Sequence, residues 1–132
     1  MVNAIYMFRK LILFLTSLVF LASCSKKSGG EDTSPPLITI VSPLNNQVFT
    51  AGQTIQITVN ASDNDKVTEL HIQVINKTNG NLLRLIHSFL GQANGTAEDS
   101  FIAEAGVTYI IEVLAQDPAQ NLTTSKVEVS GN

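Results

Sequence analysis

Apolar and polar residues alternate along most of the chain from Leu37 onward. This period of two is typical of β-strands that bury one face and expose the other, as strands of antiparallel sheets do. The clearest run is Thr54–Ala61, and the same pattern recurs over Val67–Ile75. The side chains expected to point inward from these two runs are Ile55, Ile57, Val59, Ala61, Leu70, Ile72 and Val74. We therefore expect both strands to line one core.

Clusters of Gly, Pro, Asn, Asp and Ser separate these runs and predict turns. Asn79-Gly80 fits the tip of a hairpin, while Ser62–Lys66 and Gly91–Gly95 are predicted to be connections outside the strands. In Val107–Ala115 both faces are partly apolar, which places this strand at the centre of a sheet. The predicted strands span residues 37–41, 54–61, 67–75, 81–89, 96–103, 107–115 and 122–129.

About seven short strands in roughly a hundred residues predict an all-β fold, an antiparallel β-sandwich. The alternative is an eight-stranded barrel around a ligand cavity. A barrel would need longer strands and a longer chain.

The N-terminus has a different pattern. Arg9 and Lys10 precede an uncharged, largely apolar run, Leu11–Ser25, which predicts a secretory signal helix and is short for a membrane span. Its end, Leu21-Ala22-Ser23-Cys24, resembles the lipobox of bacterial lipoproteins. That resemblance implies cleavage before Cys24, a diacylglycerol thioether on its sulfur and, in Gram-negative bacteria, an acyl chain on its new amino group. The alternatives are an ordinary signal cleavage or an uncleaved anchor.

The domain organisation follows from this pattern. Residues 1–23 are predicted to be the signal peptide, 24–36 a flexible, disordered tether rich in small polar residues, and 37–130 the sandwich. Without Arg9 and Lys10 the mature chain keeps 6 of the 8 basic residues against all 11 acidic ones, a formal net charge of −5. No basic run can follow a phosphate backbone, so we expect no nucleic-acid partner. Cys24 is the single cysteine, so no disulfide is possible within the chain.

A spaced set of residues resembles the bacterial immunoglobulin-like domain of cell-envelope and secreted proteins. The set is Pro36, Ile38, Ile40, Pro43, Gly52, Ala61-Ser62-Asp63, Gly106, Tyr109, Ala115, Asp117 and Asn121. Gln120 stands where the family usually has Gly. The resemblance implies an Ig-like β-sandwich, and together with the lipobox it implies a small Ig-like lipoprotein of a Gram-negative bacterium.

Four oxygen-bearing side chains near predicted turns are candidate calcium ligands: Asp63, Asp65, Asp117 and Asn121. They would converge if two strand connections met at one end of the sandwich, and Ca²⁺ prefers carboxylate and amide oxygens. The resemblance also allows calcium, since some family members bind it at domain ends. The alternative is that these residues cap turns by accepting hydrogen bonds from nearby backbone N–H groups.

His71 and His87 are the two histidines, and Glu69 shares the outward face of its strand with His71. A surface zinc pair is one interpretation, but two histidines without a third ligand at fixed spacing are more typical of solvated strand residues. No catalytic set or phosphate loop can be placed, so we expect no enzyme activity and no cofactor beyond the lipid.

Aromatic residues are few after the signal, with no Trp and only Tyr109, Phe49, Phe89 and Phe101. Tyr109 fits the tyrosine corner of Ig-like sandwiches, in which the ring packs inward and the hydroxyl bonds to nearby backbone. The scarcity of other aromatic rings argues against a sugar-stacking platform.

The resulting hypothesis is a non-enzymatic envelope lipoprotein, held in the membrane by its lipid, that presents an Ig-like domain to a protein partner or serves in adhesion. The alternatives are an accessory module for oligosaccharide or calcium in an envelope uptake system, and a pure spacer. Ser25 follows the cysteine, where an Asp commonly retains lipoproteins at the inner membrane. The resemblance to lipoproteins therefore implies the outer membrane and leaves the leaflet open. The oligomeric state is left open by the sequence.

Overall fold

The computed structural model describes residues 30–132, and Glu31–Asn132 form one compact unit. The predicted signal peptide, Cys24 and most of the predicted tether lie outside the described residues. The described part is built from strands and turns. Within it, no helix has the length and apolar character needed to cross a membrane.

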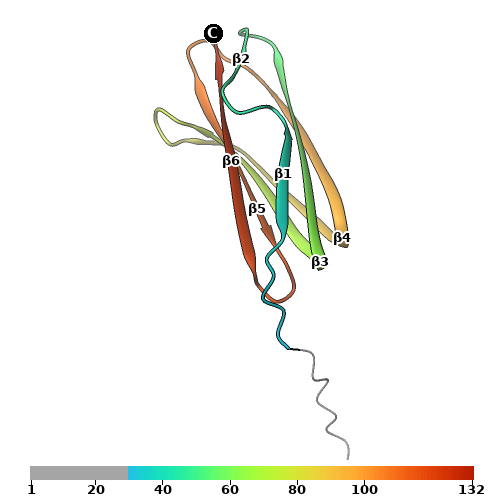
Figure 1. The fold of residues 1–132 in the computed structure, drawn as a ribbon. Helices are drawn as coiled ribbons and strands as arrows, with labels where there is room; N and C mark the ends of the chain where they lie inside the picture. Colours follow the sequence, from blue (N-terminus) through green and yellow to red (C-terminus); the bar gives the residue numbers. More distant parts are fainter. Residues whose placement is uncertain (1–29) are drawn as a thin grey trace, which may run out of the picture. The chain divides into compact units, whose positions relative to one another are not determined.

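Six strands make up the domain (Figure 1). They are β1 (Leu37–Ser42), β2 (Gln47–Phe49), β3 (Thr54–Asn76), β4 (Leu82–Ile102), β5 (Thr108–Gln116) and β6 (Leu122–Gly131). Their order is β1-β3-β5-β6-β2, and β4 pairs with β3. All pairs are antiparallel except β2 with β6. The sequence-based prediction of an all-β, antiparallel sandwich is confirmed.

Two long strands pass from one layer of the sandwich to the other. Residues 54–62 of β3 lie between β1 and residues 94–102 of β4, whereas residues 69–76 lie between β5 and residues 82–89 of β4. The register shifts between Ser62 and Val67, where β3 bends. Figure 1 shows β3 descending on the right, bending at the lower end and rising to the hairpin on the left, with β4 running back beside it.

The prediction that Ser62–Lys66 and Gly91–Gly95 are connections outside the strands was wrong. Strand geometry continues through both segments. The physical reason is that the register shifts allow the paired strands to bend without parting, so polar and glycine residues mark a bend here instead of a strand end.

The core lies between the two layers. Every side chain predicted to point inward from β3 is buried, and the alternating residues of β5, Tyr109, Ile111, Val113 and Ala115, are buried as well. The register explains this, because partners such as Ile72 and Val113 share one face of the sheet. β5 pairs with β3 on one side and β6 on the other, which confirms its central place.

The described segment before β1 contacts the domain. The Asn121 side-chain amide donates to the Asp32 carbonyl over 2.9 Å, and the Thr123 hydroxyl donates to the carbonyl of Pro36. The Asn64 amide donates to the Asp32 carboxylate over 2.9 Å. These bonds tie Asp32–Pro36 to β3 and β6. The predicted boundary between tether and domain stays a prediction.

Candidate functional site

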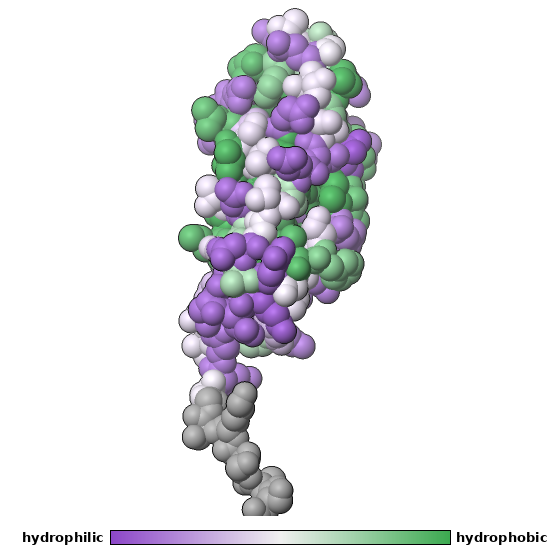
Figure 2. Space-filling view, turned by 90° about the vertical axis from the view of Figure 1, so that its right-hand side faces the viewer, coloured by the Kyte–Doolittle hydropathy of each residue, from purple (hydrophilic) through white to green (hydrophobic). Residues whose placement is uncertain are grey.

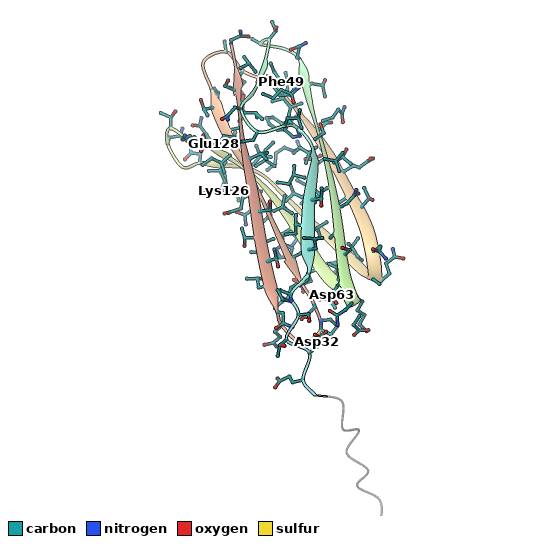
Figure 3. The ribbon with its side chains drawn as sticks, viewed as in Figure 1. Asp32, Phe49, Asp63, Lys126 and Glu128 are labelled. Carbon is teal, nitrogen blue, oxygen red and sulfur yellow. The ribbon has the colours of Figure 1, made fainter. Side chains whose placement is uncertain are left out.

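Three carboxylates from separate parts of the chain converge at the end of the domain where the described chain begins. Asp32 lies in the entering segment, Asp63 at the bend of β3, and Asp117 directly after β5. One oxygen from each lies within 4.8 Å of the others. Figure 3 shows Asp32 and Asp63 together at this end, and Figure 2 shows hydrophilic residues gathered there.

Asp63 is positioned by its own backbone bend. Its Oδ1 accepts hydrogen bonds from the backbone N–H groups of Asp65 (2.9 Å) and Lys66 (3.1 Å). Its Oδ2 is buried and has no hydrogen-bond partner among the described residues. A buried carboxylate oxygen without a partner is unfavourable, because it has lost water and gained nothing in exchange.

Asp117 is 2% exposed and organises the turn between β5 and β6. Its Oδ1 accepts from the Asn121 backbone N–H (2.8 Å), and its Oδ2 accepts from the Asn121 side-chain amide (2.7 Å). Gln120 adopts the left-handed conformation in this turn, with φ 70°. A non-glycine residue can take this conformation at modest cost when the turn bonds around it hold it there.

Asp32 is held in its charged form. The backbone N–H of Ser34 and, secondarily, the side-chain amide of Asn64 lower the pKa of its carboxyl, because both donate to the anion. The carboxyl groups of Asp63 and Asp117 lie within a few ångströms of it. Three carboxylates in this arrangement repel one another unless a cation lies between them.

The structure brings together two of the four residues predicted to bind calcium, Asp63 and Asp117, and adds Asp32. The Asp65 carboxylate is outside the group of three, and the Asn121 amide braces Asp117 and Asp32 as a hydrogen-bond donor. Asp32 was missed because it reads as one polar residue among many in the entering segment. The sequence feature that could have identified Asp32 is its position, an acidic residue a few residues before the first predicted strand.

The two histidines face each other across β3 and β4, where they are register partners. His87 Nδ1 lies 3.1 Å from His71 Nε2. His71 Nε2 also lies 3.2 Å from a carboxylate oxygen of Glu69. The three side chains lie on the outward face of the sheet. They do not form a group of three converging ligand atoms of the kind seen for the aspartates.

A polar hollow of about 430 Å³ lies on the outer face of the other layer. It runs across β1, β3 and β4, and its lining residues are Thr39, Asn60, Ala61, Ser62, Asn94, Gly95 and Thr96. The Thr96 hydroxyl donates to the Asn60 side-chain oxygen over 2.9 Å. No aromatic ring lines this hollow, so it offers no stacking surface for a sugar.

Tyr109 is 1% exposed, and its hydroxyl accepts a hydrogen bond from the backbone N–H of Glu104 over 2.8 Å. Its ring packs edge-on against Phe101, with centroids 4.9 Å apart. The residue therefore joins β5 to the loop that precedes it.

Comparison with known proteins supports the fold. The sequence profile of the bacterial Ig domain matches residues 36–100. A structure of fibronectin(III)-like modules of CbhA from Clostridium thermocellum is 21% identical with a TM-score of 0.51, and the likeness covers 74% of this chain and 47% of that chain. This chain thus spans about half the length of that one.

The superoxide reductase neelaredoxin from Ignicoccus hospitalis is 12% identical with a TM-score of 0.54, over 74% of this chain and 80% of that chain. At these identities the likenesses show the fold alone. Among curated proteins, none matches this sequence.

Proposed function

We propose that this protein is a non-enzymatic lipoprotein of the cell envelope. The proposal starts from its immunoglobulin-like domain, which forms the all-β sandwich. Cys24 carries the lipid anchor, and the domain presents a surface to a protein partner. Bacterial Ig domains and fibronectin-like modules are typically non-catalytic, which supports an interaction role.

The observation that carries the interaction role is the open edge of β4. Along residues 82–102, β4 pairs with β3 on one side and with no other strand of the described chain. Its first half exposes large apolar side chains, Leu82, Leu83, Leu85 and Phe89. Unpaired backbone groups beside exposed apolar side chains are suited to binding a protein.

This interaction role is tested by photo-crosslinking in intact cells. A photoreactive residue placed at Phe89 should capture an envelope protein, because that side chain is 76% exposed on the open strand. The same residue placed at Thr124, an exposed position on β6, is the matched control. Equal capture at both positions, or at neither, would count against an interaction surface on β4.

The anchor leads to a second prediction. Cys24→Ser should release the protein from the membrane fraction into the soluble fraction, because serine has no sulfur to form the thioether. Several acyl chains hold a lipoprotein firmly, at about 0.8 kcal/mol per buried CH₂, so the shift should be nearly complete. Cell fractionation with an antibody to the domain measures it.

Ser28→Ala is the control for that experiment and should leave the protein in the membrane fraction. If the wild-type protein in the membrane fraction keeps residues 1–23 and carries no lipid on Cys24, as mass spectrometry would show, the apolar run is an uncleaved anchor and the lipoprotein proposal fails.

A second candidate function is calcium binding at the acidic cluster Asp32, Asp63 and Asp117. The carrying observation is the buried, unpartnered Oδ2 of Asp63 beside two further carboxylates. A hard cation would satisfy that oxygen and offset the repulsion, and Ca²⁺ prefers such ligands. Because Asp32 lies in the entering segment, the ion would stiffen the point at which the chain joins the domain. The oligosaccharide alternative has less support, since its hollow lacks aromatic side chains.

Calcium is therefore expected to stabilise the domain. At a hundredfold excess of calcium over its dissociation constant, the free energy of unfolding rises by about 2.7 kcal/mol, which raises Tm by roughly 11–22 °C. Asp63→Asn should remove most of this rise, whereas Asp65→Asn, whose carboxylate lies outside the cluster, should keep it. Thermal melts in excess calcium and in chelator measure the effect. Identical melting curves in the two buffers would eliminate the calcium proposal.

A further inference from the structure

β4 differs from the other edges of the sandwich. β1 is six residues long and is flanked by Pro36 and Pro43, while β2 has three residues. The outer side of β6 lies beside β1 and carries Lys126. Short length, proline and lysine are the usual features that keep an edge from pairing with another chain. β4 has 21 residues and contains neither proline nor lysine.

The first half of β4 has a regular register and an ordered outward face. Residues 84–89 pair with β3 without a shift, from Val74↔Arg84 to Glu69↔Phe89. Leu85, His87 and Phe89 therefore point to the same side, away from the core. Leu85 and Phe89 are 46% and 76% exposed. The outward row reads apolar, histidine, apolar, which is symmetric about His87.

We propose that this edge binds the same edge of a second copy of the chain, antiparallel and centred on His87. A two-fold axis at His87 places Leu85 opposite Phe89 of the second copy, and each His87 opposite the other. Symmetric pairing of this kind is the isologous contact of two-fold dimers. It rests on the interaction role proposed above and names the partner for that surface.

One pairing register between the β4 strands of the two copies is favoured over its neighbour. The outward faces of the two copies match only when odd-numbered residues pair with odd-numbered residues, because side chains alternate along a strand. A two-fold axis shifted to Ile86 would place Leu85 opposite a histidine. The axis at His87 pairs Leu85 with Phe89, so the burial of apolar surface favours it over the axis at Ile86.

The charge on this strand is compatible with pairing. Arg84 is the single formal charge between Leu82 and Leu90, and its guanidinium donates to both Asp99 carboxylate oxygens over 2.6 and 2.8 Å. Asp99, through this hydrogen bond and its negative charge, raises the pKa of Arg84. A strand that pairs with β4 therefore does not bury an unpaired charge, because Arg84 already forms an ion pair with Asp99.

The exposed apolar side chains of β4 give a contact at the lower end of the size range of specific interfaces. Phe89 is 76% exposed and alone leaves roughly 110–190 Å² of apolar surface open, for an aromatic side chain of about 150–250 Å². About half of each of Leu82, Leu83 and Leu85 is exposed as well, which extends the open apolar surface along the strand. Two copies with their paired backbones approach the roughly 1,000 Å² total that a biological interface needs.

The geometry of the dimer has a consequence for the membrane. The two-fold axis is perpendicular to the sheet, and this half of β4 descends toward the end where Asp32 lies (Figures 1 and 3). The Asp32 ends of the two copies therefore lie at opposite ends of the pair. Cys24 precedes Glu31 by seven residues, a reach of about 25 Å at most, whereas the ten residues of β6 span about 33 Å. Because the Asp32 ends point in opposite directions, chains anchored in two facing membranes can pair through this edge.

Disulfide crosslinking of the full lipidated chain tests the register. Cys24 is blocked by its lipid, so an introduced cysteine is the one free thiol. His87→Cys should form a disulfide dimer under mild oxidation, because directly opposed strand residues lie within disulfide reach. Leu85→Cys and Phe89→Cys should crosslink when mixed, far more than either alone. Thr124→Cys is the control and should stay monomeric.

Vesicle clustering tests the facing arrangement. Vesicles of bacterial phospholipid carrying the lipidated protein should cluster, as measured by light scattering. Phe89→Glu should reduce clustering at least tenfold, because it places a charge opposite Leu85, whereas Leu122→Glu should leave it unchanged. Absence of both the His87→Cys dimer and the mixed dimer would overturn the inference. Capture of another envelope protein at Phe89 without self-crosslinking would overturn it too, yet leave the proposed interaction role standing.

Discussion

Tyr109→Ala is expected to lower the free energy of unfolding by about 3–5 kcal/mol, a large part of the stability of a domain of this size. The ring is fully buried, contacts Phe101 edge-on and fills the core beside β5. Its removal leaves a cavity that the surrounding β-sheet cannot close, because backbone pairing fixes β5 on both sides. Urea denaturation followed by circular dichroism measures the loss.

Tyr109→Phe separates the hydroxyl from the ring. It keeps the packing but leaves the Glu104 N–H without its acceptor, so we expect a loss of about 1–2 kcal/mol. If the two variants were equally destabilised, the hydroxyl bond and not the ring would dominate. If Tyr109→Ala cost less than 1 kcal/mol, the buried position described for this side chain would be wrong.

Gly131→Ala is the second substitution with a large expected effect. A Cβ at this position would lie 2.2 Å from the carbonyl oxygen of Glu104 and 3.0 Å from its carbonyl carbon. Both atoms are backbone, and Gly131 itself is bonded on both sides, donating to the Val107 carbonyl and accepting from the Gly106 N–H, each over 2.9 Å. Neither strand nor loop can move aside without breaking these bonds. We expect a loss of about 1–3 kcal/mol or more.

Gly30→Ala is the matched control, because a Cβ there meets nothing within 4 Å. Its unfolding midpoint in urea should equal that of the wild type, while that of Gly131→Ala should fall. An unchanged midpoint for Gly131→Ala would show that β6 and the Glu104 loop are not in contact as described.

Local alternation of side chains identified the strand-forming runs of β3 and their buried faces, but not where the strands begin and end. In the runs Thr54–Ala61 and Val67–Ile75, the apolar side chains that the sequence predicts to face the core are buried. The prediction succeeds because successive side chains of a strand point to opposite faces, whichever strand it pairs with. For the bend between them the sequence predicts a loop. Polar residues such as Asp63 look alike in a loop and in a bent strand, and the register with β4 decides between the two.

The sequence by itself determined the all-β class, the inward-facing residues and the candidates Asp63 and Asp117, since each depends on nearby residues and their polarity. Only the tertiary structure decided that Asp32 joins them and that Asp65 does not, because the group forms where the entering segment meets β3 and the turn after β5. It also decided which strand is left open at an edge. Pairing between segments far apart in the chain sets both features, and alternation carries no information about which strands become neighbours.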